Sequence, residues 1–299
     1  MDVVLGLDAG GTKILAGLVG RDGAVRAVRE RATPRVGDRC DPGLVALQSV
    51  VADLLGDARA AGARVRGVGL GMPEYVRDGI VTSAEVFAWE RQPGEVVAAV
   101  PGMDAVPVVV EADVRCAALA EALARAVTDL AYLSWGTGLS WTQVAGGRCA
   151  DGARGEALAL GEWPVDPRSG TVWDGTLEGF ASGLAIQRRY AQGAGHPLEG
   201  GRIEALAAAG DEVAETVLAS AAEAVAWAVA GLVHAVDPRL VVLGGGVAVR
   251  SARLPQQVAR RVPQILRRPA PPAVEVALAG GSAGLVGAAL TAWSVVDAL

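Results

Sequence analysis

The residues best suited to chemistry directly follow the first apolar stretch of the chain. Asp8 precedes Gly10, Gly11, Thr12 and Lys13, and Lys13 is the only lysine in a chain whose other cationic residues are arginines. Glycines let backbone N–H groups approach an anion, the hydroxyl donates a hydrogen bond, and the ammonium adds a point charge. The motif favours binding of metal-bound phosphate. The simpler alternative is a β-hairpin whose Gly-Gly turn happens to carry a lysine.

Three further glycine-rich loops support the phosphate interpretation. They lie at residues 136–138, 244–246 and 280–284, each at an expected strand end or helix start, and Asp113 falls between the first two loops of the chain. Helix N-termini and glycine-rich turns offer unpaired N–H donors to phosphate. Asp113 could instead be the N-cap of the helix that follows it.

The elements around these loops repeat in outline. Strands are expected at 3–8, 14–19 and 24–31, and again at 130–135 and 139–144, with a Gly/Thr turn inside each group. This duplication predicts two similarly built α/β domains that face a shared cleft.

Hydrophobic periodicity predicts the remaining elements. Further strands are expected at 65–71, 106–111 and 240–243, a proline-rich surface connection at 267–274, and helices at 42–61, 114–126, 178–192, 202–209, 212–236 and 282–293.

Composition limits the function classes. With 299 residues, 20% charged and 52% apolar, the chain can form two globular domains. Its net charge of −6 gives no electrostatic case for nucleic acid or an anionic membrane surface. Three cysteines without a Cys-x-x-Cys pair indicate a reducing compartment, and the apolar segment 221–236 looks too short and too polar to span a bilayer. A cytoplasmic protein is expected.

Taken together, the motifs resemble the ROK sugar kinases (repressor, open reading frame, kinase) of the actin/hexokinase/Hsp70-like superfamily. The matching stretches run from end to end of the chain and are Leu7-Asp8-Ala9-Gly10-Gly11-Thr12-Lys13, Glu111-Ala112-Asp113, Trp135-Gly136-Thr137-Gly138, residues 175–183, Val242-Leu243-Gly244-Gly245-Gly246-Val247 and residues 283–289.

The resemblance implies two ribonuclease-H-like lobes around a central cleft for nucleotide and sugar. The smaller lobe would comprise residues 1–113 joined by a C-terminal helix at 286–299, and the larger lobe residues 114–285. The resemblance also implies a homodimer.

The resemblance assigns roles to the motif residues. ATP would be bound with Mg²⁺, which Asp8 would hold through water, and Asp113 would be the catalytic base for a sugar hydroxyl. The residues implied in binding ATP and its phosphates are Asp8, Gly10, Gly11, Thr12, Lys13, Gly136, Thr137, Gly138, Gly245 and Gly246, with the 280–284 turn also at the adenosine.

The chain departs from the family pattern around the sugar. Ala112 replaces the asparagine of the usual Glu-Asn-Asp, Ala159 a sugar-binding glutamate, and Glu162 a histidine, while Glu74 replaces the glycine of a Pro-Gly turn. The family's zinc cluster is missing from residues 168–176, so no structural zinc is expected.

These departures suggest an acceptor. We expect Ala112, Asp113, Glu74, Glu162 and Glu178 to line the sugar pocket. Extra carboxylates cost desolvation unless they are paired, so an ammonium on the substrate would suit them. The favoured acceptor is therefore an amino sugar such as kanosamine, from antibiotic biosynthesis, phosphorylated at the 6-OH. If Glu162 pairs with an arginine instead, that argument fails.

Other readings keep the fold and change the function. A C7-cyclitol kinase and a glucokinase of the same family remain open, as does a non-catalytic sugar sensor. The family's DNA-binding repressors carry an N-terminal helix-turn-helix, whereas this sequence starts on the phosphate strand.

Overall fold

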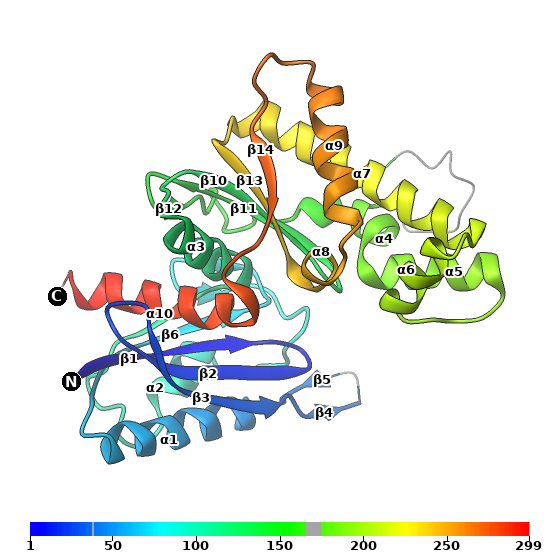
Figure 1. The fold of residues 1–299 in the computed structure, drawn as a ribbon. Helices are drawn as coiled ribbons and strands as arrows, with labels where there is room; N and C mark the ends of the chain where they lie inside the picture. The colour runs from blue at the N-terminus through cyan, green and yellow to red at the C-terminus, as the bar shows by residue number, and fades with distance from the viewer. Residues whose placement is uncertain (38, 166–174, 299) are drawn as a thin grey trace. The chain divides into compact units, whose positions relative to one another are not determined.

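The computed structural model describes residues 1–37, 39–165 and 175–298, which divide into two compact units (Figure 1). Unit 1 comprises Met1–Arg125, Asp151–Glu156 and Ala279–Leu299, and unit 2 comprises Ala126–Ala150 and Ala157–Leu278. The expected lobes differ from these units, because residues 114–125, 151–156 and 279–285 lie in unit 1.

Unit 1 is built on a five-stranded sheet in the order β3-β2-β1-β6-β9. β1 and β2 pair antiparallel, as do β2 and β3, whereas β6 runs parallel to β1 and β9 runs parallel to β6. The carboxyl ends of β1, β6 and β9 therefore meet at one edge of the sheet. The strands are β1 (Asp2–Ala9), β2 (Lys13–Val19), β3 (Val25–Ala32), β6 (Arg64–Met72) and β9 (Val108–Ala112).

Helices cover both faces of this sheet. Figure 1 shows α1 and α10 on opposite sides of it. Glycines allow α10 to approach closely, because a Cβ on Gly69 of β6 would overlap the carbonyl oxygen of Ala288, and one on Gly287 would overlap that of Cys116. The helices are α1 (Val45–Ala60), α2 (Pro93–Ala98), α3 (Asp113–Arg125) and α10 (Ala283–Val296), and two short hairpins pair β4 (Arg35–Val36) with β5 (Arg39–Cys40) and β7 (Val76–Arg77) with β8 (Ile80–Val81).

Unit 2 repeats the arrangement with a sheet in the order β12-β11-β10-β13-β14. Again the first three strands in this order pair antiparallel, whereas β13 runs parallel to β10 and β14 runs parallel to β13. The duplication predicted from the sequence is confirmed, as is the α/β class. The strands are β10 (Leu130–Trp135), β11 (Leu139–Ala145), β12 (Arg148–Cys149), β13 (Leu240–Gly244) and β14 (Ala273–Val276).

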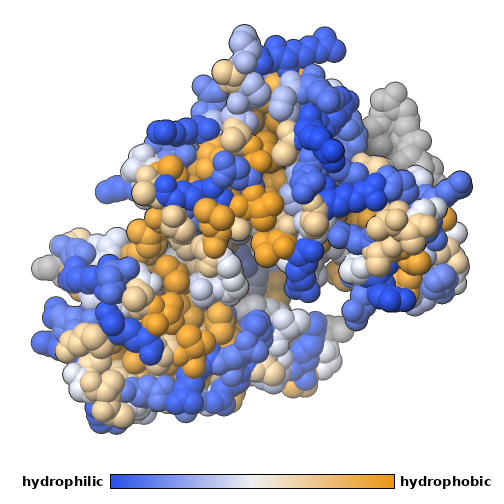
Figure 2. Space-filling view, viewed as in Figure 1, coloured by the Kyte–Doolittle hydropathy of each residue, from blue (hydrophilic) through white to orange (hydrophobic). Residues whose placement is uncertain are grey.

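The helices of unit 2 pack around α7, whose buried face lies in the main apolar core of the unit. They are α4 (Leu177–Ala181), α5 (Gly183–Ala194), α6 (Gly200–Ala208), α7 (Glu212–Val236), α8 (Gly245–Arg250) and α9 (Leu254–Leu266). In the same unit, Figure 2 shows apolar surface in the region of β14, where Val276 is partly exposed and Leu278, just beyond it, is exposed.

The argument from length against a membrane span at 221–236 was wrong. The helix begins at Glu212, and its 25 residues are long and apolar enough to cross a bilayer by length and composition alone. Of the most apolar window, 61% is buried inside the protein. A core helix of a globular unit has the same character, and α7 packs against α6 and α9.

Two further expectations differ from the structure. The single helix expected at 178–192 is divided at Ser182, which adopts an extended conformation and whose Oγ accepts a hydrogen bond from the N–H of Ala185 at 3.2 Å. Helix α9 was not among the elements delineated from the sequence. Pro255 is tolerated in its first turn, but Pro263 lies inside it and masked the helical pattern.

A buried carboxylate joins two distant parts of unit 1. Glu121 of α3 is fully buried and accepts hydrogen bonds from Nε of Arg125 at 3.0 Å and from the N–H of Ala279 at 2.6 Å. It thereby fixes the point at which the chain re-enters unit 1 ahead of α10.

We predict that Glu121→Ala lowers the free energy of unfolding by about 3 kcal/mol, because it removes a buried carboxylate that accepts hydrogen bonds from Arg125 and from the N–H of Ala279. Urea unfolding followed by circular dichroism measures the change. The exposed Glu90→Ala is the matched control, with an expected change within about 0.5 kcal/mol. Equal effects of the two substitutions would contradict the role given to Glu121.

Candidate active site

The predicted phosphate turn connects β1 to β2 in unit 1. The N–H of Gly10 donates to the carbonyl of Lys13 at 2.9 Å, and the Oγ–H of Thr33 donates to the carbonyl of Gly10 at 2.6 Å. Thr12 is exposed, and its carbonyl accepts the N–H of Thr33 at 3.0 Å. The turn is thus held from behind by Thr33 while its outer side stays open.

Lys13 lies at the start of β2 and forms an ion pair with Glu30 at 2.7 Å. More than half of each side chain is exposed, at 53% and 57%. An exposed pair of this kind contributes at most about 1 kcal/mol, so it does not prevent Lys13 from turning to a phosphate.

Asp8 is the carboxylate of this turn. It is partly buried near the end of β1, and burial raises its pKa from 3.8 to about 6, against the lowering effect of the Lys13 charge. Gly284 in the first turn of α10 packs on it, since a Cβ there would overlap the Asp8 carboxyl group. Within the described part of the chain, no group donates a hydrogen bond to this carboxylate.

Asp113 begins α3, directly after β9. Burial raises the pKa of Asp113 to about 7, with further upward contributions from the charges of Asp8 and Glu74 and a downward one from the N–H of Val114. The Val114 N–H donates to Oδ1 at 2.6 Å. An N-cap side chain accepts from the second or third helical N–H instead, so Asp113 does not cap α3 in the usual way.

The two residues that precede Asp113, at the end of β9, have structural roles. Ala112 is buried, and Glu111 forms an ion pair at 2.8 Å with the fully buried Arg115 of α3. The guanidinium of Arg115 also donates to the carbonyls of Val76 and Gly155 at 3.0 and 2.8 Å. Arg115 thereby ties the segment 151–156 to the helix that begins with Asp113.

Glu74 follows β6 and is only 4% exposed. Its two carboxylate oxygens accept hydrogen bonds from the hydroxyl of Ser83 and from three backbone N–H groups in residues 85–87, at 2.6–2.8 Å. Hydrogen bonds within the chain therefore compensate its negative charge. Glu74 no longer supports the expectation of an ammonium on the substrate.

In unit 2 the Gly136-Thr137-Gly138 turn joins β10 to β11. The N–H of Gly183, at the start of α5, donates to the carbonyl of Gly136 at 2.8 Å. Glu178, expected at the sugar, accepts the N–H of Leu139 at 2.7 Å, and its Oε2 lies 2.6 Å from the position that a Cβ on Gly138 would occupy. Glu178 thus supports the turn.

A cavity of about 620 Å³ opens beside this turn. Its volume suits a nucleoside. Gly246 lines the cavity, whereas Gly245, at φ 80°, packs against the backbone of Trp135. The lining includes Gly136, Thr137, Gly183, Leu184, Gln187, Glu199, Gly200, Gly201, Glu204, Gly246 and Arg250.

The sequence reasoning missed part of this cavity. Glu199, Gly200, Gly201, Glu204 and Arg250 line it, and two signals pointed there: a Gly-Gly pair at the start of α6, and a cation four residues after Gly246. The 280–284 turn, which the resemblance put at the adenosine, lies in unit 1 against Asp8.

The positions at 159–162 that depart from the family pattern lie in or next to a short 3₁₀ segment of unit 2. Ala159 immediately precedes this segment, Leu160–Glu162, and Glu162 is exposed. The zinc-cluster positions 168–174 lie outside the described residues. Among the described residues, no three His, Cys, Asp or Glu side chains converge as a metal site.

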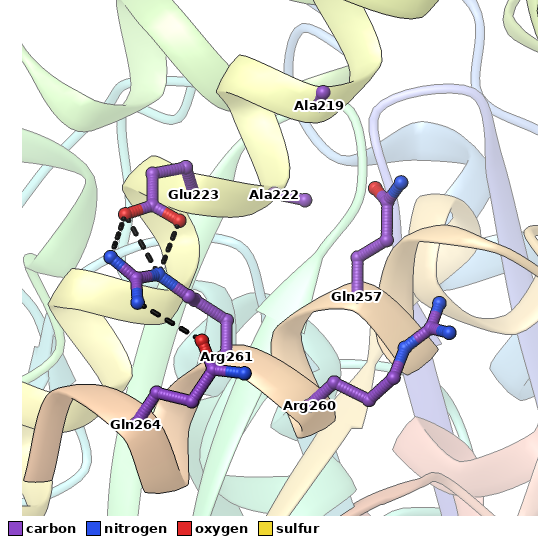
Figure 3. Close-up of a pocket in the computed structure, with 7 residues that line it drawn as sticks. All are labelled: Ala219, Ala222, Glu223, Gln257, Arg260, Arg261 and Gln264. Atoms are coloured by element: carbon purple, nitrogen blue, oxygen red, sulfur yellow. Dashed lines mark hydrogen bonds and ion pairs between the residues drawn. The ribbon is translucent and has the colours of Figure 1, made fainter.

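A second pocket in unit 2, of about 360 Å³, contains none of the predicted site residues. Figure 3 shows it between α7 and α9, where Arg261 forms an ion pair with Glu223 at 2.8 Å and donates to Gln264 at 3.1 Å. Because these charged groups bind each other, the pocket gives no sign of a phosphate or sugar site.

Solved structures similar to this chain include a ROK hexokinase from Thermus thermophilus, with a TM-score of 0.84 and 31% identity over 99% of this chain and 100% of that one. A ROK family glucokinase from Streptomyces griseus, in complex with glucose and AMPPNP, has a TM-score of 0.79 and 29% identity over 98% and 99% of the two chains.

Similar sequences include a bifunctional enzyme and N-acetylmannosamine kinases. The bifunctional enzyme NanE/NanK of Brucella melitensis biotype 1 is 35% identical over 96% of this chain, which spans about half (53%) of that relative. N-acetylmannosamine kinase of Shigella flexneri is 29% identical over 84% of this chain and 85% of its own length. The model of the ROK family matches residues 4–294. With nearly its whole length matched, the chain belongs to the ROK family.

Proposed function

We propose that this protein transfers the γ-phosphoryl group of ATP to a hydroxyl, the primary 6-OH by default, of a hexose-like sugar. The observation that carries the proposal is the Asp113 carboxyl group, partly buried at the start of α3 with its pKa raised to about 7, in the unit that also holds Asp8 and the phosphate turn. The kinases among the similar proteins support the same reaction class.

Asp113 acts as the base. A carboxylate with a pKa near the working pH accepts a proton efficiently, and burial removes the water that would compete for it. The sugar hydroxyl gives its proton to Asp113 as its oxygen bonds to the γ-phosphorus, the bond to the β-phosphate oxygen breaks, and ADP leaves. Alignment and charge neutralisation supply most of the rate enhancement.

Asp8 fits a magnesium site. Its carboxylate is partly buried, and no hydrogen bond from the described residues competes for its oxygens. Magnesium keeps several of its waters in proteins, so a single carboxylate suffices to hold the hydrated ion. When bound, the ion neutralises charge on the β- and γ-phosphates. Lys13 and the N–H group of Gly11 bind the same phosphates, whereas the N–H of Gly10 is engaged by the carbonyl of Lys13.

Unit 2 supplies the nucleotide-binding groups. The Gly136–Gly138 turn and the Thr137 hydroxyl offer donors to phosphate, and the adjoining cavity, lined by Gly246, takes the nucleoside. Glu178 keeps the turn in place through the Leu139 N–H. We therefore assign Glu178 to the turn rather than to the sugar.

The acceptor within this class depends on fewer residues than the sequence suggested. Because Glu74 is balanced internally, the amino-sugar proposal, with kanosamine as its candidate, depends on Glu162. N-acetylmannosamine and glucose are the acceptors suggested by the names of similar proteins. The homodimer and the cytoplasmic location stay predictions.

Asp113→Asn should lower kcat by about 10²–10⁴-fold, the usual contribution of a general base. Formation of the sugar phosphate from ATP, followed by ³¹P NMR, measures it. The exposed Asp104→Asn is the matched control and should keep wild-type turnover. Unchanged kcat in Asp113→Asn would remove the proposed base.

The same variant should be more stable than the wild type at pH 8. The pKa of Asp113 is raised above its ordinary value of 3.8, because the folded protein disfavours the ionised carboxylate. The fold is therefore more stable at low pH, where the carboxyl group is protonated, and this stability is lost as pH rises through about 7. Asparagine carries no charge, and we expect a gain of about 1–3 kcal/mol at pH 8 and none at pH 4. Urea unfolding at the two pH values compares the variants.

The pH profile of kcat/KM provides an independent test. Asp113 must be ionised to accept a proton, so kcat/KM should fall as pH drops below about 7, and fall more steeply below about 6, where Asp8 also becomes protonated. A coupled assay for ADP between pH 5 and 8.5 measures the profile. Activity that stays constant down to pH 5 would contradict the raised pKa values.

Acceptor selectivity separates the remaining candidates. If Glu162 pairs with a substrate ammonium, kcat/KM for kanosamine should exceed that for glucose by about 30-fold or more, and Glu162→Gln should abolish the preference. The exposed Glu156→Gln serves as the control. Equal values for the two sugars in the wild type would dismiss the amino-sugar acceptor and leave glucose, N-acetylmannosamine and cyclitols to be ranked by the same assay.

A further inference from the structure

Three carboxylates lie along one edge of the unit 1 sheet. Asp8 lies near the end of β1, Glu74 follows β6, and Asp113 follows β9, and β6 is the strand between the other two. Like charges at such an edge repel one another, and the Glu74 charge contributes to the raised pKa of Asp113. A glutamate in the middle position therefore needs strong compensation.

Residues 83–87 supply that compensation. The N–H groups of Glu85, Val86 and Phe87 each donate to the Glu74 carboxylate at 2.8 Å, and the Ser83 hydroxyl donates at 2.6 Å. Successive backbone N–H groups form a concave anion-binding site of the kind that proteins use for phosphate. Here the bound anion is a side chain of the same chain, so Glu74 holds the segment in one conformation.

The opposite side of this segment contacts the phosphate turn. Cγ1 of Val86 lies 2.9 Å from the position that a Cβ on Gly11 would occupy. Phe87 forms a parallel bridge with Cys40, whose carbonyl accepts the N–H of Ala88 at 3.2 Å, and the Cys40 Sγ–H is 3.5 Å from the carbonyl of Gly11. The segment thus lies against Gly11 directly and through Cys40.

We propose that Glu74 is a positioning residue that clamps residues 83–87 against the phosphate turn, and so shapes the acceptor side of the Asp113 site without touching the sugar. This inference depends on the kinase function proposed above. Both oxygens of Glu74 are already engaged and the side chain is 4% exposed, so a sugar would have to displace backbone donors to reach it. Its role for the sugar is the placement of its neighbours.

The test combines kinetics with amide hydrogen exchange in the full chain. The variants are Glu74→Ala, Glu74→Gln and Ser83→Ala, with the exposed Glu90→Gln as control. In Glu74→Ala we expect faster exchange at residues 85–87 and a fall in kcat/KM of about 100-fold for every sugar accepted, with the acceptor KM raised at least tenfold. Glu74→Gln and Ser83→Ala, which each remove fewer hydrogen bonds than Glu74→Ala, should both give smaller changes.

Two outcomes would overturn the inference. If exchange at 85–87 accelerates while kcat and the acceptor KM stay within twofold of the wild type, Glu74 only holds a loop. If exchange is unchanged and a single sugar loses activity, Glu74 contacts that sugar. Should Glu74→Ala fail to fold, the two milder variants give the same comparison. Absence of turnover in the wild type, by contrast, would contradict the kinase proposal itself.

Discussion

Carboxylates withheld from water at one edge of a parallel β-sheet are the constraint on which unit 1 depends. Asp8, Glu74 and Asp113 end or follow three neighbouring strands, and burial raises the pKa of Asp8 and of Asp113. The protein compensates them differently. Glu74 receives three backbone N–H groups and a hydroxyl, Asp113 receives one N–H, and Asp8 receives no hydrogen bond from the described residues. The two less compensated groups are the ones for which the proposed reaction provides a partner: a hydroxyl proton for Asp113 and a hydrated cation for Asp8.

Unit 2 repeats the strand order of unit 1 and uses it differently. Its first turn, Gly136–Gly138, corresponds in the duplication to the phosphate turn of unit 1 but is followed by no lysine and is held by Glu178. The cavity beside it is lined by glycines from three elements, so backbone can approach a ligand closely. One sheet topology thus carries buried acids in unit 1 and an open, donor-rich pocket in unit 2, which agrees with a division between phosphoryl transfer and nucleotide binding.

Local patterns made much of this predictable. Alternation of strand and glycine turn located β1, β2, β10 and β11, and the residues of α7 were expected without error because its apolar periodicity is unbroken. The failure at Glu74 comes from interactions that no short window contains. The Glu74 carboxylate accepts hydrogen bonds from residues that lie nine to thirteen positions later in the sequence, in a segment without periodicity. Its charge therefore looked available for substrate. The break at Ser182 depends on a side-chain cap, and α9 tolerates an internal proline because the rest of its apolar face is buried.

The central claim is that the surroundings of Asp113 raise its pKa to about 7 before any ligand binds. A ¹³C NMR titration of aspartate side-chain carboxyl groups in the ligand-free protein, with the Asp113 signal assigned by its loss in Asp113→Asn, measures this directly. The account predicts a midpoint near 7, shifted downward when Asp8 is replaced by asparagine, because the Asp8 charge raises the pKa of Asp113. A midpoint near 4, the value for an exposed aspartate, would contradict it.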